Sequence, residues 1–503
     1  MCILNDIIYL YLIFSKKDKK MVFSSLFFVF FFLAVAYGVY FSVKTNRTRN
    51  IILLVSSLIF YAWGGPTLVL LLCLMTFICW AGAIAISKAE EKQKTALLWA
   101  TALICLGILV IFKYTGFLMS TAFSILPIEG TVPSIALPIG ISFYTFQLIS
   151  YVIDVRRGEV GAQTKYWTLL LYASLFHQCI AGPIVRYADV NYDIEHRVIK
   201  REEISAGITR FATGLAKKAI LANGCGAICD GIFNNSAGAP LTAGEIANLS
   251  SGAILLGCFA FMLQIYLDFS AYSDMAIGMG LMVGFHYKEN FNYPYVADSV
   301  TDFWRRWHIS LSSFFRDYVY IPMGGNRVSI PRHILNMLTV WALTGFWHGA
   351  NWNFILWGLF FFVFLILEKY LIKPKKNPIL PIKLLRILGT QVIVYVSFML
   401  FKFTDLAAFG QSFIGIFDVA SWFKMGFADT QTVMTLKNNI FFIAVSVIAC
   451  TPVVPLAIKL LNKTEITRRI KAVAGIAIPA VLLIVSAFAL AGDSYNPFLY
   501  FQF

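Results

Sequence analysis

Residues 334–372 read ILNMLTVWALTGFWHGANWNFILWGLFFFVFLILEKYLI, in which two apolar runs flank a short turn. Each run reaches or approaches the ~20 residues that span the hydrocarbon core of a bilayer. The turn holds His348 and Gly349, so an ionisable side chain lies at or below the membrane interface. Because burial of such a group costs free energy, a residue at that depth is by default a candidate for a functional site. A hydrogen-bonded structural histidine is the alternative.

The whole chain has the composition of a membrane protein. Of its 503 residues, 59% are hydrophobic and 13% are charged, against roughly 25% charged residues in an average soluble domain. These values exclude a water-soluble fold. The net charge of +15 comes from 41 Lys and Arg residues, which occur in short clusters between apolar runs, where such clusters set membrane topology. We therefore interpret them as loop charges and expect no nucleic acid partner.

Apolar runs continue along the chain and predict an all-α polytopic membrane protein with about ten to twelve transmembrane helices. Several runs are short or interrupted by glycine and proline, as at Pro138-Ile139-Gly140 and Ala181-Gly182-Pro183. Broken or re-entrant helices at membrane depth are tolerated only where they are buried in protein or line a wet cavity. The sequence therefore predicts a helical bundle around a central tunnel.

The first twenty residues differ from the rest of the chain. Their apolar stretch of about a dozen residues is too short to span a bilayer, and the basic cluster Lys16-Lys17-Asp18-Lys19-Lys20 follows it. The next apolar run thus has basic residues at both ends, which the positive-inside tendency cannot satisfy. We expect residues 1–20 to be an upstream extension and residues 21–503, beginning at Met21, to form a single membrane domain.

A second informative stretch, residues 299–320, reads SVTDFWRRWHISLSSFFRDYVY. At about 100° per residue, a helix here collects its aromatic side chains on one arc and its arginine side chains on the other. Such an amphipathic helix lies along the membrane interface, and a surface anchor without further function is the simplest interpretation. His308 falls at the border of the two faces, where its imidazole can point toward the protein interior. We therefore expect it to be the partner of His348.

Further polar groups lie in the apolar residues 264–274, which read QIYLDFSAYSD. Asp268 and Asp274 are intramembrane carboxylates by context, and we expect each to pair with Arg305 or Arg306, to orient an imidazole, or to form another structural ion pair. His308 and His348 are forty positions apart and no additional ligand lies at metal-binding spacing, so we expect no metal site. The candidates for tunnel walls or substrate contacts are Gln264, Asp268, Tyr272, Asp274, Trp304, Arg305, Trp307, Ser312 and Trp347.

Long stretches of the chain, in the same order, resemble the membrane-bound O-acyltransferase (MBOAT) family, and within it the bacterial branch that contains the alginate O-acetylation membrane protein. The resemblance covers nearly everything from Met21 onward. The stretches that carry it are MVFSS at 21–25, LPIGISFYTFQ at 137–147, AGPIVRY at 181–187, DFS at 268–270, FWRRWHISLS at 303–312, FWHG at 346–349 and YFQF at 500–503.

This resemblance implies a reaction and a place for it. His348 corresponds to the family's invariant histidine and His308 to its second important histidine, placed on opposite sides of, or deep within, a tunnel through the protein. His348 would activate the acceptor oxygen, and His308 would position or polarise an acyl thioester. The implied donor is acetyl-CoA, used as a co-substrate, with no bound cofactor. The acetyl group would cross the bacterial cytoplasmic (inner) membrane, and a separate extracytoplasmic O-acetyltransferase would esterify a polysaccharide.

Two alternatives remain open at the level of the sequence. A sister branch of the family moves D-alanine toward teichoic acid, so the fold does not fix the acyl group. A transporter that moves a lipid or glycan without making or breaking bonds would also have broken helices and intramembrane carboxylates.

Overall fold

The computed structural model describes residues 21–126, 130–180, 182–373, 378–461 and 465–492, and Leu499. These residues form helices and connecting loops, and their one isolated β-bridge joins Asn234 and Pro240. The proposed extension, residues 1–20, lies outside the described residues, as do Ala181 and the terminal stretch 500–503. Two compact units can be distinguished, and one long helix, α14 (Ser251–Met282), contributes to both.

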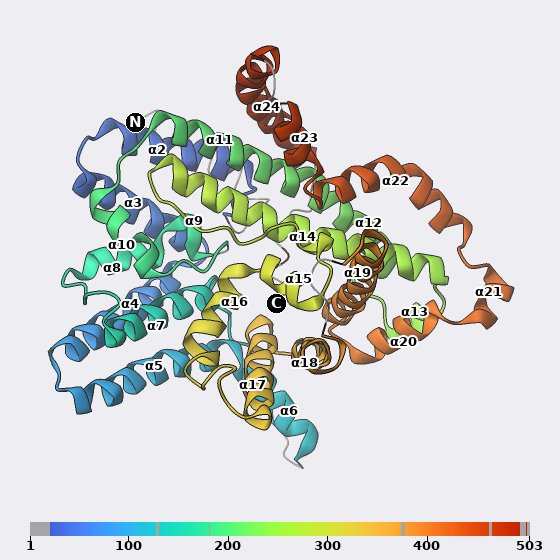
Figure 1. Ribbon diagram of the computed structural model, residues 1–503, viewed down its shortest axis with the longest axis horizontal. Coiled ribbons are helices and arrows are strands. Elements are labelled where there is room, and N and C mark those ends of the chain that lie inside the picture. Colours follow the sequence, from blue (N-terminus) through green and yellow to red (C-terminus); the bar gives the residue numbers. More distant parts are fainter. Residues whose placement is uncertain are drawn as a thin grey trace. The chain divides into compact units, whose positions relative to one another are not determined.

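The first unit contains the described residues up to Ala212, together with Asp274–Lys288 and the residues from Ile484 onward. Its helices are drawn mainly in blue to green in Figure 1. They are η1 (Phe28–Phe32), α2 (Leu33–Ser42), α3 (Asn46–Trp63), α4 (Pro66–Lys88), α5 (Glu91–Lys113), α6 (Thr115–Ile125), α7 (Ile141–Arg157), α8 (Tyr166–Ser174), α9 (Phe176–Cys179), α10 (Tyr187–His196) and most of α11 (Arg201–Ala216).

The second unit contains Thr213–Ser273 and the described residues from Glu289 to Leu483. Its helices are η2 (Lys217–Ala222), α12 (Asn223–Phe233), α13 (Ala243–Ile246), η3 (Pro294–Val296), α15 (Val300–Arg306), α16 (Ile309–Phe315), η4 (Arg316–Tyr320), α17 (Ile330–His348), α18 (Trp352–Leu367), η5 (Glu368–Ile372), α19 (Leu380–Lys402), α20 (Leu406–Ile416), α21 (Val419–Met425), α22 (Thr430–Ala449), α23 (Val453–Leu461) and most of α24 (Glu465–Gly492).

Seven helices of the described residues are long and apolar enough to cross a membrane, which makes the chain a multi-pass membrane protein. They lie in α4, α5, α14, α18 with η5, α19, α22 and the C-terminal part of α24. Three shorter apolar helices, Phe28–Ser42, Thr115–Ile125 and Leu406–Ile416, accompany them. The all-α polytopic fold is as expected from the sequence. The number of full-length spans is lower than the expected ten to twelve, because several apolar runs do not continue as one long helix.

Two of these interruptions show their cause. The run at about 167–184 is divided into α8 and α9, because Leu175 between them leaves the helical conformation. At the start of α7, Gly140 has a φ of 74°, and a Cβ there would lie 2.3 Å from the carbonyl oxygen of Cys179. A left-handed conformation and a contact this close both require glycine. The predicted break at Pro138-Ile139-Gly140 is therefore confirmed, whereas the break at Leu175 is an additional one that the sequence did not indicate.

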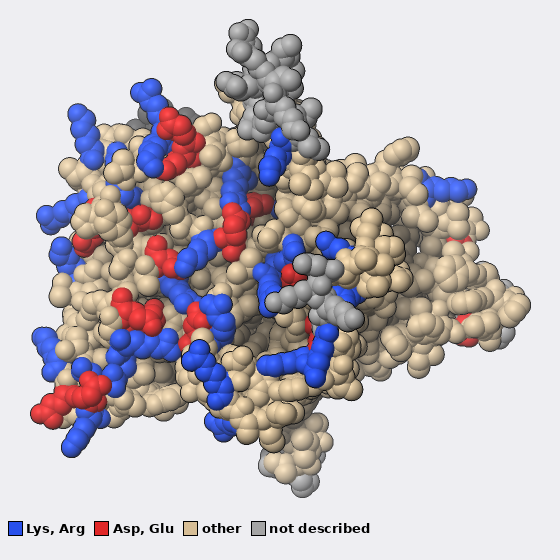
Figure 2. Space-filling view, in the orientation of Figure 1, with Lys and Arg blue, Asp and Glu red and all other residues tan. Residues whose placement is uncertain are grey.

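The spans differ in what surrounds them. In α14, 89% of the apolar window is buried inside the protein, whereas in α22 only 6% is buried. The apolar face of α22 is therefore left for lipid, and α14 supplies interior surface. On the face shown in Figure 2, positively and negatively charged side chains lie among one another, with red atoms beside blue ones. The pairs Arg156–Glu91 and Lys288–Asp189 are examples within the first unit.

Candidate active site

The segment predicted to be one helix over 299–320 is broken at His308. Helix α15 ends at Arg306, α16 starts at Ile309, and His308 between them is left-handed, with φ 44° and ψ 54°. A helix would bond the Ile309 amide to the preceding turn. Instead, the Ile309 amide donates to the backbone carbonyl of Asn290 at 2.9 Å, and the Ser310 amide donates to the Asn290 side-chain oxygen at 3.2 Å. A loop distant in sequence thus replaces the helical hydrogen bonds.

The aromatic side of this broken segment packs against protein. Trp304 lies 4.6 Å from Trp341 and 5.6 Å from Trp357, measured between ring centroids. Trp307 lies 5.1 Å from Phe398 in the same way. The surface anchor interpretation needed these rings to face the bilayer, and their burial against α17, α18 and α19 instead places His308 inside the second unit. The buried members of this side are Phe303, Trp304, Trp307, Leu311, Phe314, Phe315 and Tyr318.

His348 is the last residue of α17 and is only 4% exposed. Its imidazole is 4.9 Å from the Trp357 ring and 5.5 Å from the Phe401 ring, and both rings are turned edge-on to it. Helices α17 and α18 approach each other closely at Gly358. A Cβ on this residue would lie 2.3 Å from the Trp341 carbonyl oxygen, so only glycine fits there. These contacts fix the imidazole in an aromatic enclosure.

Gly349, directly after His348, leaves room for a close neighbour. A Cβ at this position would lie 2.1 Å from a ring carbon of Phe354, so the group that uses the space is an aromatic ring of the protein. The glycine therefore allows α18 to turn back directly after His348. It does so in an extended conformation that any residue can adopt, and the close approach is the reason for the glycine.

The two histidines come together in the second unit. Their ring centroids are 6.4 Å apart, and the His308 ring is also 4.6 Å from Phe269 and 5.7 Å from Trp347. His308 is fully buried and lies outside the seven candidate spans. Burial lowers its pKa to about 3, so the imidazole is neutral at physiological pH. Two imidazoles at this separation can face one small reacting group from two sides.

The other residues expected near the site are distributed more widely. Trp347 contacts the His308 ring, and Gln264 and Tyr272 are buried on α14. Arg305 is exposed. Trp304 and Ser312 line a cavity of about 150 Å³ whose remaining walls are Leu311, Phe315, Arg316, Tyr320, Met337, Val340, Trp341 and Thr344. Trp304, which lines this cavity, contacts Trp357, and Trp357 in turn contacts His348.

The two aspartates pair with cations that the sequence did not single out. Asp268 forms a fully buried ion pair with Lys218 of η2, at 2.9 Å. Asp274 pairs with Arg210 at 3.0 Å and belongs to the first unit, whereas Asp268 belongs to the second. The expected pairing with Arg305 or Arg306 is therefore wrong, and Arg306 itself pairs with Asp302. Of the expected roles, the structural ion pair fits both carboxylates.

Sequence reasoning missed three residues that shape this site. Asn290 binds the turn at His308, and Trp357 and Phe401 enclose His348. Asn290 stands in the polar loop after α14, and nothing in its neighbours distinguishes it from an ordinary loop asparagine. The two aromatic residues stand in apolar runs that read as membrane spans. Only tertiary contacts identify them.

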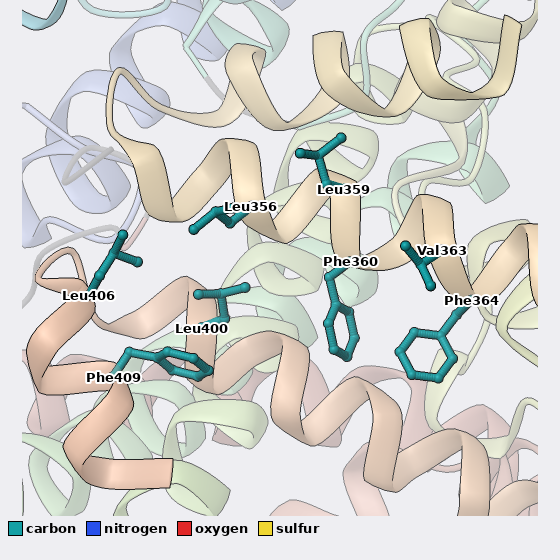
Figure 3. A pocket seen from close by; sticks show the side chains of 8 residues that line it. All are labelled: Leu356, Leu359, Phe360, Val363, Phe364, Leu400, Leu406 and Phe409. Atoms are coloured by element: carbon teal, nitrogen blue, oxygen red, sulfur yellow. The ribbon is translucent and has the colours of Figure 1, made fainter. Parts of the chain in front are cut away.

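A second, larger hollow lies on another face of α18. It has a volume of about 530 Å³ and is lined entirely by apolar side chains of α18, α19 and α20. Figure 3 shows Leu356, Phe360 and Val363 of α18 beside this hollow, opposite Leu400 and Phe409. With no polar group in its walls it offers no acid, base or nucleophile. The described residues also contain no group of three His, Cys, Asp or Glu side chains that could hold a metal ion.

Comparison with known proteins places the chain in a family. The model of the MBOAT, membrane-bound O-acyltransferase, family matches residues 159–404, which contain both His308 and His348. The chain is also 35% identical to the probable alginate O-acetylase AlgI of Azotobacter vinelandii, over 96% of this chain and 100% of that protein. The chain belongs to the membrane-bound O-acyltransferase family. Membership makes it an acyltransferase by class, as its sequence predicts.

Other relatives of this O-acyltransferase differ in the substrates that their names give. It is 32% identical to the peptidoglycan O-acetyltransferase of Helicobacter pylori, over 67% of this chain and 68% of that protein. It is 26% identical to the teichoic acid D-alanyltransferase of Streptococcus thermophilus, over 53% of this chain and 66% of that protein. Membership in the MBOAT family therefore leaves the acyl group and the acceptor to be decided at the site.

Proposed function

We propose that this acyltransferase moves an acetyl group from acetyl-CoA across the bacterial cytoplasmic membrane for O-acetylation of an extracellular or cell-envelope polysaccharide. The observation that carries the proposal is the pair of buried imidazoles of His308 and His348, 6.4 Å apart in the second unit. The similarity to probable alginate O-acetylases over almost the whole chain supports acetyl as the acyl group. The +15 net charge suits a donor that carries phosphates.

The reaction is an acyl transfer from sulfur to oxygen. An acceptor hydroxyl oxygen attacks the carbonyl carbon of the thioester, so that a C–O bond forms and the C–S bond breaks. His348 accepts the hydroxyl proton and passes it to the leaving thiolate, which a neutral imidazole can do. His308 positions the thioester. The aromatic rings around His348 exclude water, which would otherwise compete for the acetyl group. A separate extracytoplasmic O-acetyltransferase completes the transfer to the polysaccharide.

Replacement of His348 by alanine in the bacterium tests this function. Ester-bound acetate on the envelope polysaccharide is measured in cells that carry His348→Ala as their only copy. We expect the acetate to fall to the level of a deletion strain while the protein is inserted in normal amounts. His196→Ala removes an exposed histidine of the first unit and is the matched control, with unchanged acetate expected. Wild-type acetylation in the His348→Ala cells would exclude the proposal.

D-Alanyl transfer is the second candidate, because the relatives include teichoic acid D-alanyltransferases. The same pair of imidazoles would serve it, because the transfer of D-alanine to a hydroxyl group is also an acyl transfer. The two candidates differ in the label that reaches the envelope. Cells fed with labelled acetate or labelled D-alanine should show His348-dependent ester label only from acetate if the acetyl proposal holds.

A further inference from the structure

Asn290 holds the ring of His308 through one side-chain oxygen. This Oδ1 atom accepts hydrogen bonds from the Ser310 amide at 3.2 Å and from the Ser310 hydroxyl at 2.8 Å, and it lies 3.2 Å from Nδ1 of His308. The Ser310 hydroxyl is farther from Nδ1, at 3.5 Å, and its one hydrogen goes to Asn290 at the shorter distance. The Asn290 side-chain nitrogen donates to the Ser273 hydroxyl at 3.2 Å. Asn290 is fully buried. All of these residues belong to the second unit.

These contacts fix which way the Asn290 amide faces. A backbone N–H is always a donor, so the atom that it meets at the Asn290 side chain must be the oxygen. An amide oxygen can only accept. Nδ1 of His308 must therefore carry the proton to bond to it. In a neutral imidazole only one ring nitrogen is protonated, so Nε2 of His308 is an unprotonated acceptor.

The backbone supports the same assignment. His308 holds a left-handed conformation, which is strained for an ordinary residue and persists only where neighbouring contacts require it. The hydrogen bonds from Ile309 and Ser310 to Asn290 are those contacts. Asn290 thus determines both where the imidazole lies and which nitrogen it turns to the site. Nε2 has no hydrogen-bond partner among the described residues.

We infer that Asn290 is a positioning residue that keeps His308 in the Nδ1–H form, so that Nε2 acts in acyl transfer as a hydrogen-bond acceptor and cannot polarise the thioester carbonyl. A thioester carbonyl accepts hydrogen bonds and has no proton to offer, so it has no bond to make with an unprotonated nitrogen. The groups that Nε2 fits are hydrogen-bond donors, and on the thioester donor itself such a group is an N–H, for example the amide nearest to the sulfur in a pantetheine group. This role rests on the proposed function, whereas the protonation of Nδ1 does not.

Asn290→Asp tests the inference with an unusual pH signature. A carboxylate at this position keeps an acceptor for Nδ1 and adds a negative charge, which stabilises the imidazolium and raises the pKa of His308. Below that raised pKa, Nε2 is protonated and cannot accept. With polysaccharide acceptor present, we expect CoA release from acetyl-CoA by the purified variant in nanodiscs to fall about ten-fold per pH unit on the acid side and to recover as the pH rises. The wild type brings no charge to His308 at this position, so the ratio of the variant rate to the wild-type rate should fall toward low pH.

Few groups face the His308 ring, so a change in the pH profile of Asn290→Asp can be assigned to His308. Besides the Asn290 side chain and the Ser310 hydroxyl, they are the rings of Phe269, Phe291 and Trp347 and the imidazole of His348, which is present in both proteins. Asn336→Asp is the matched control, because Asn336 is another fully buried asparagine of the second unit and binds backbone carbonyls of the loop at Met323 and Gly325. It should not acquire the acid limb. A variant Asn290→Asp whose activity rises toward low pH, or does not change its profile, would overturn the inference.

A spectroscopic measurement on the wild type does not depend on activity or on the folding of a variant. Solid-state nitrogen NMR of histidine-labelled protein, with a His308→Gln spectrum subtracted, reports the two nitrogens of His308. We expect a protonated Nδ1 and an unprotonated Nε2. The opposite tautomer would refute the inference while leaving the proposed function intact. If neither the wild type nor Asn290→Asp releases CoA, the proposed function fails and the tautomer is unaffected.

Discussion

His177 in the first unit and His308 in the second are both fully buried. They differ in their hydrogen-bond partners and in whether those partners fix the tautomer of the ring. Nδ1 of His177 lies 3.0 Å from the hydroxyl of Tyr287, and its ring is 4.4 Å from Phe176. A tyrosine hydroxyl can donate or accept, so it does not fix the tautomer. The amide oxygen of Asn290 only accepts and fixes the tautomer of His308. A second imidazole lies within 6.4 Å of His308.

The comparison shows that burial by itself does not make a histidine functional. His177 fits the aromatic packing of the first unit with one hydrogen bond, which is enough for a structural role. His308 adds a strained backbone, a fixed ring orientation and a second imidazole, and none of these is needed for packing. We therefore expect the same substitution to have different consequences at the two positions.

The largest effect is expected for His308→Phe. Phenylalanine keeps an aromatic ring among the rings of the second unit and removes both nitrogens. Because a positioned histidine commonly contributes about 10²- to 10⁴-fold to a rate, we expect CoA release with acceptor present to fall by at least about 10²-fold. The measurement is the initial rate of the purified variant in nanodiscs. A rate within a factor of two of the wild type would remove His308 from the chemistry.

An intermediate effect, on stability instead of rate, is expected at the buried ion pair beside the site. Asp268→Leu removes the carboxylate that Lys218 contacts at 2.9 Å, and removal of one partner of a buried ion pair typically costs about 3–5 kcal/mol. The double variant Lys218→Met and Asp268→Leu removes both charges and should recover most of that loss. Thermal unfolding of the purified proteins measures both. Full stability of the single variant would show that the ion pair does not hold η2 to α14.

The double variant also separates structure from chemistry. Phe269, next to Asp268, contacts His308, so the pair is near the site. If the ion pair is structural, the recovered double variant should transfer acetyl at close to the wild-type rate. A stable but inactive double variant would assign Lys218 or Asp268 to the reaction.

The smallest effect is expected for His177→Phe, the counterpart of His308→Phe. The ring remains in the aromatic cluster, and the hydroxyl of Tyr287 loses its partner, which costs about 1–3 kcal/mol when the group is buried. We expect a modest decrease in thermal stability and an unchanged rate per folded molecule. A rate loss as large as that of His308→Phe would erase the distinction between the two buried histidines.

The sequence predicts the parts of this protein that depend on local composition. The apolar runs indicate an all-α membrane protein, and the depth of His348 in FWHG marks it without any knowledge of its contacts. The aromatic and arginine sides of residues 299–320 are also visible in the sequence. The break at His308 is not visible, because the bonds that cause it come from Asn290, which lies in a different loop.

Long-range pairing is the part that sequence reasoning missed. Asp268 pairs with Lys218, fifty positions earlier in the chain, and the candidates considered from the sequence were the nearby arginines 305 and 306. Ion pairs inside a bundle depend on which helix faces meet, and apolar runs of similar composition do not encode that. The enclosure of His348 by Trp357 and Phe401 is likewise not encoded in local composition. An aromatic residue in a membrane span can face lipid or protein, and the sequence around it does not distinguish the two.

Acetyl transfer by the purified protein tests the central claim most directly. Wild type, His177→Phe and His348→Ala are incubated in nanodiscs with radiolabelled acetyl-CoA and a polysaccharide acceptor, together with the purified extracytoplasmic transferase where one is encoded nearby. Wild type and His177→Phe should release CoA and label the acceptor, and His348→Ala should do neither. Two results would contradict the assignment of the paired imidazoles to acyl transfer. One is label transfer by His348→Ala at the wild-type rate. The other is acetyl-CoA that stays intact with the wild type, as a transporter would leave it.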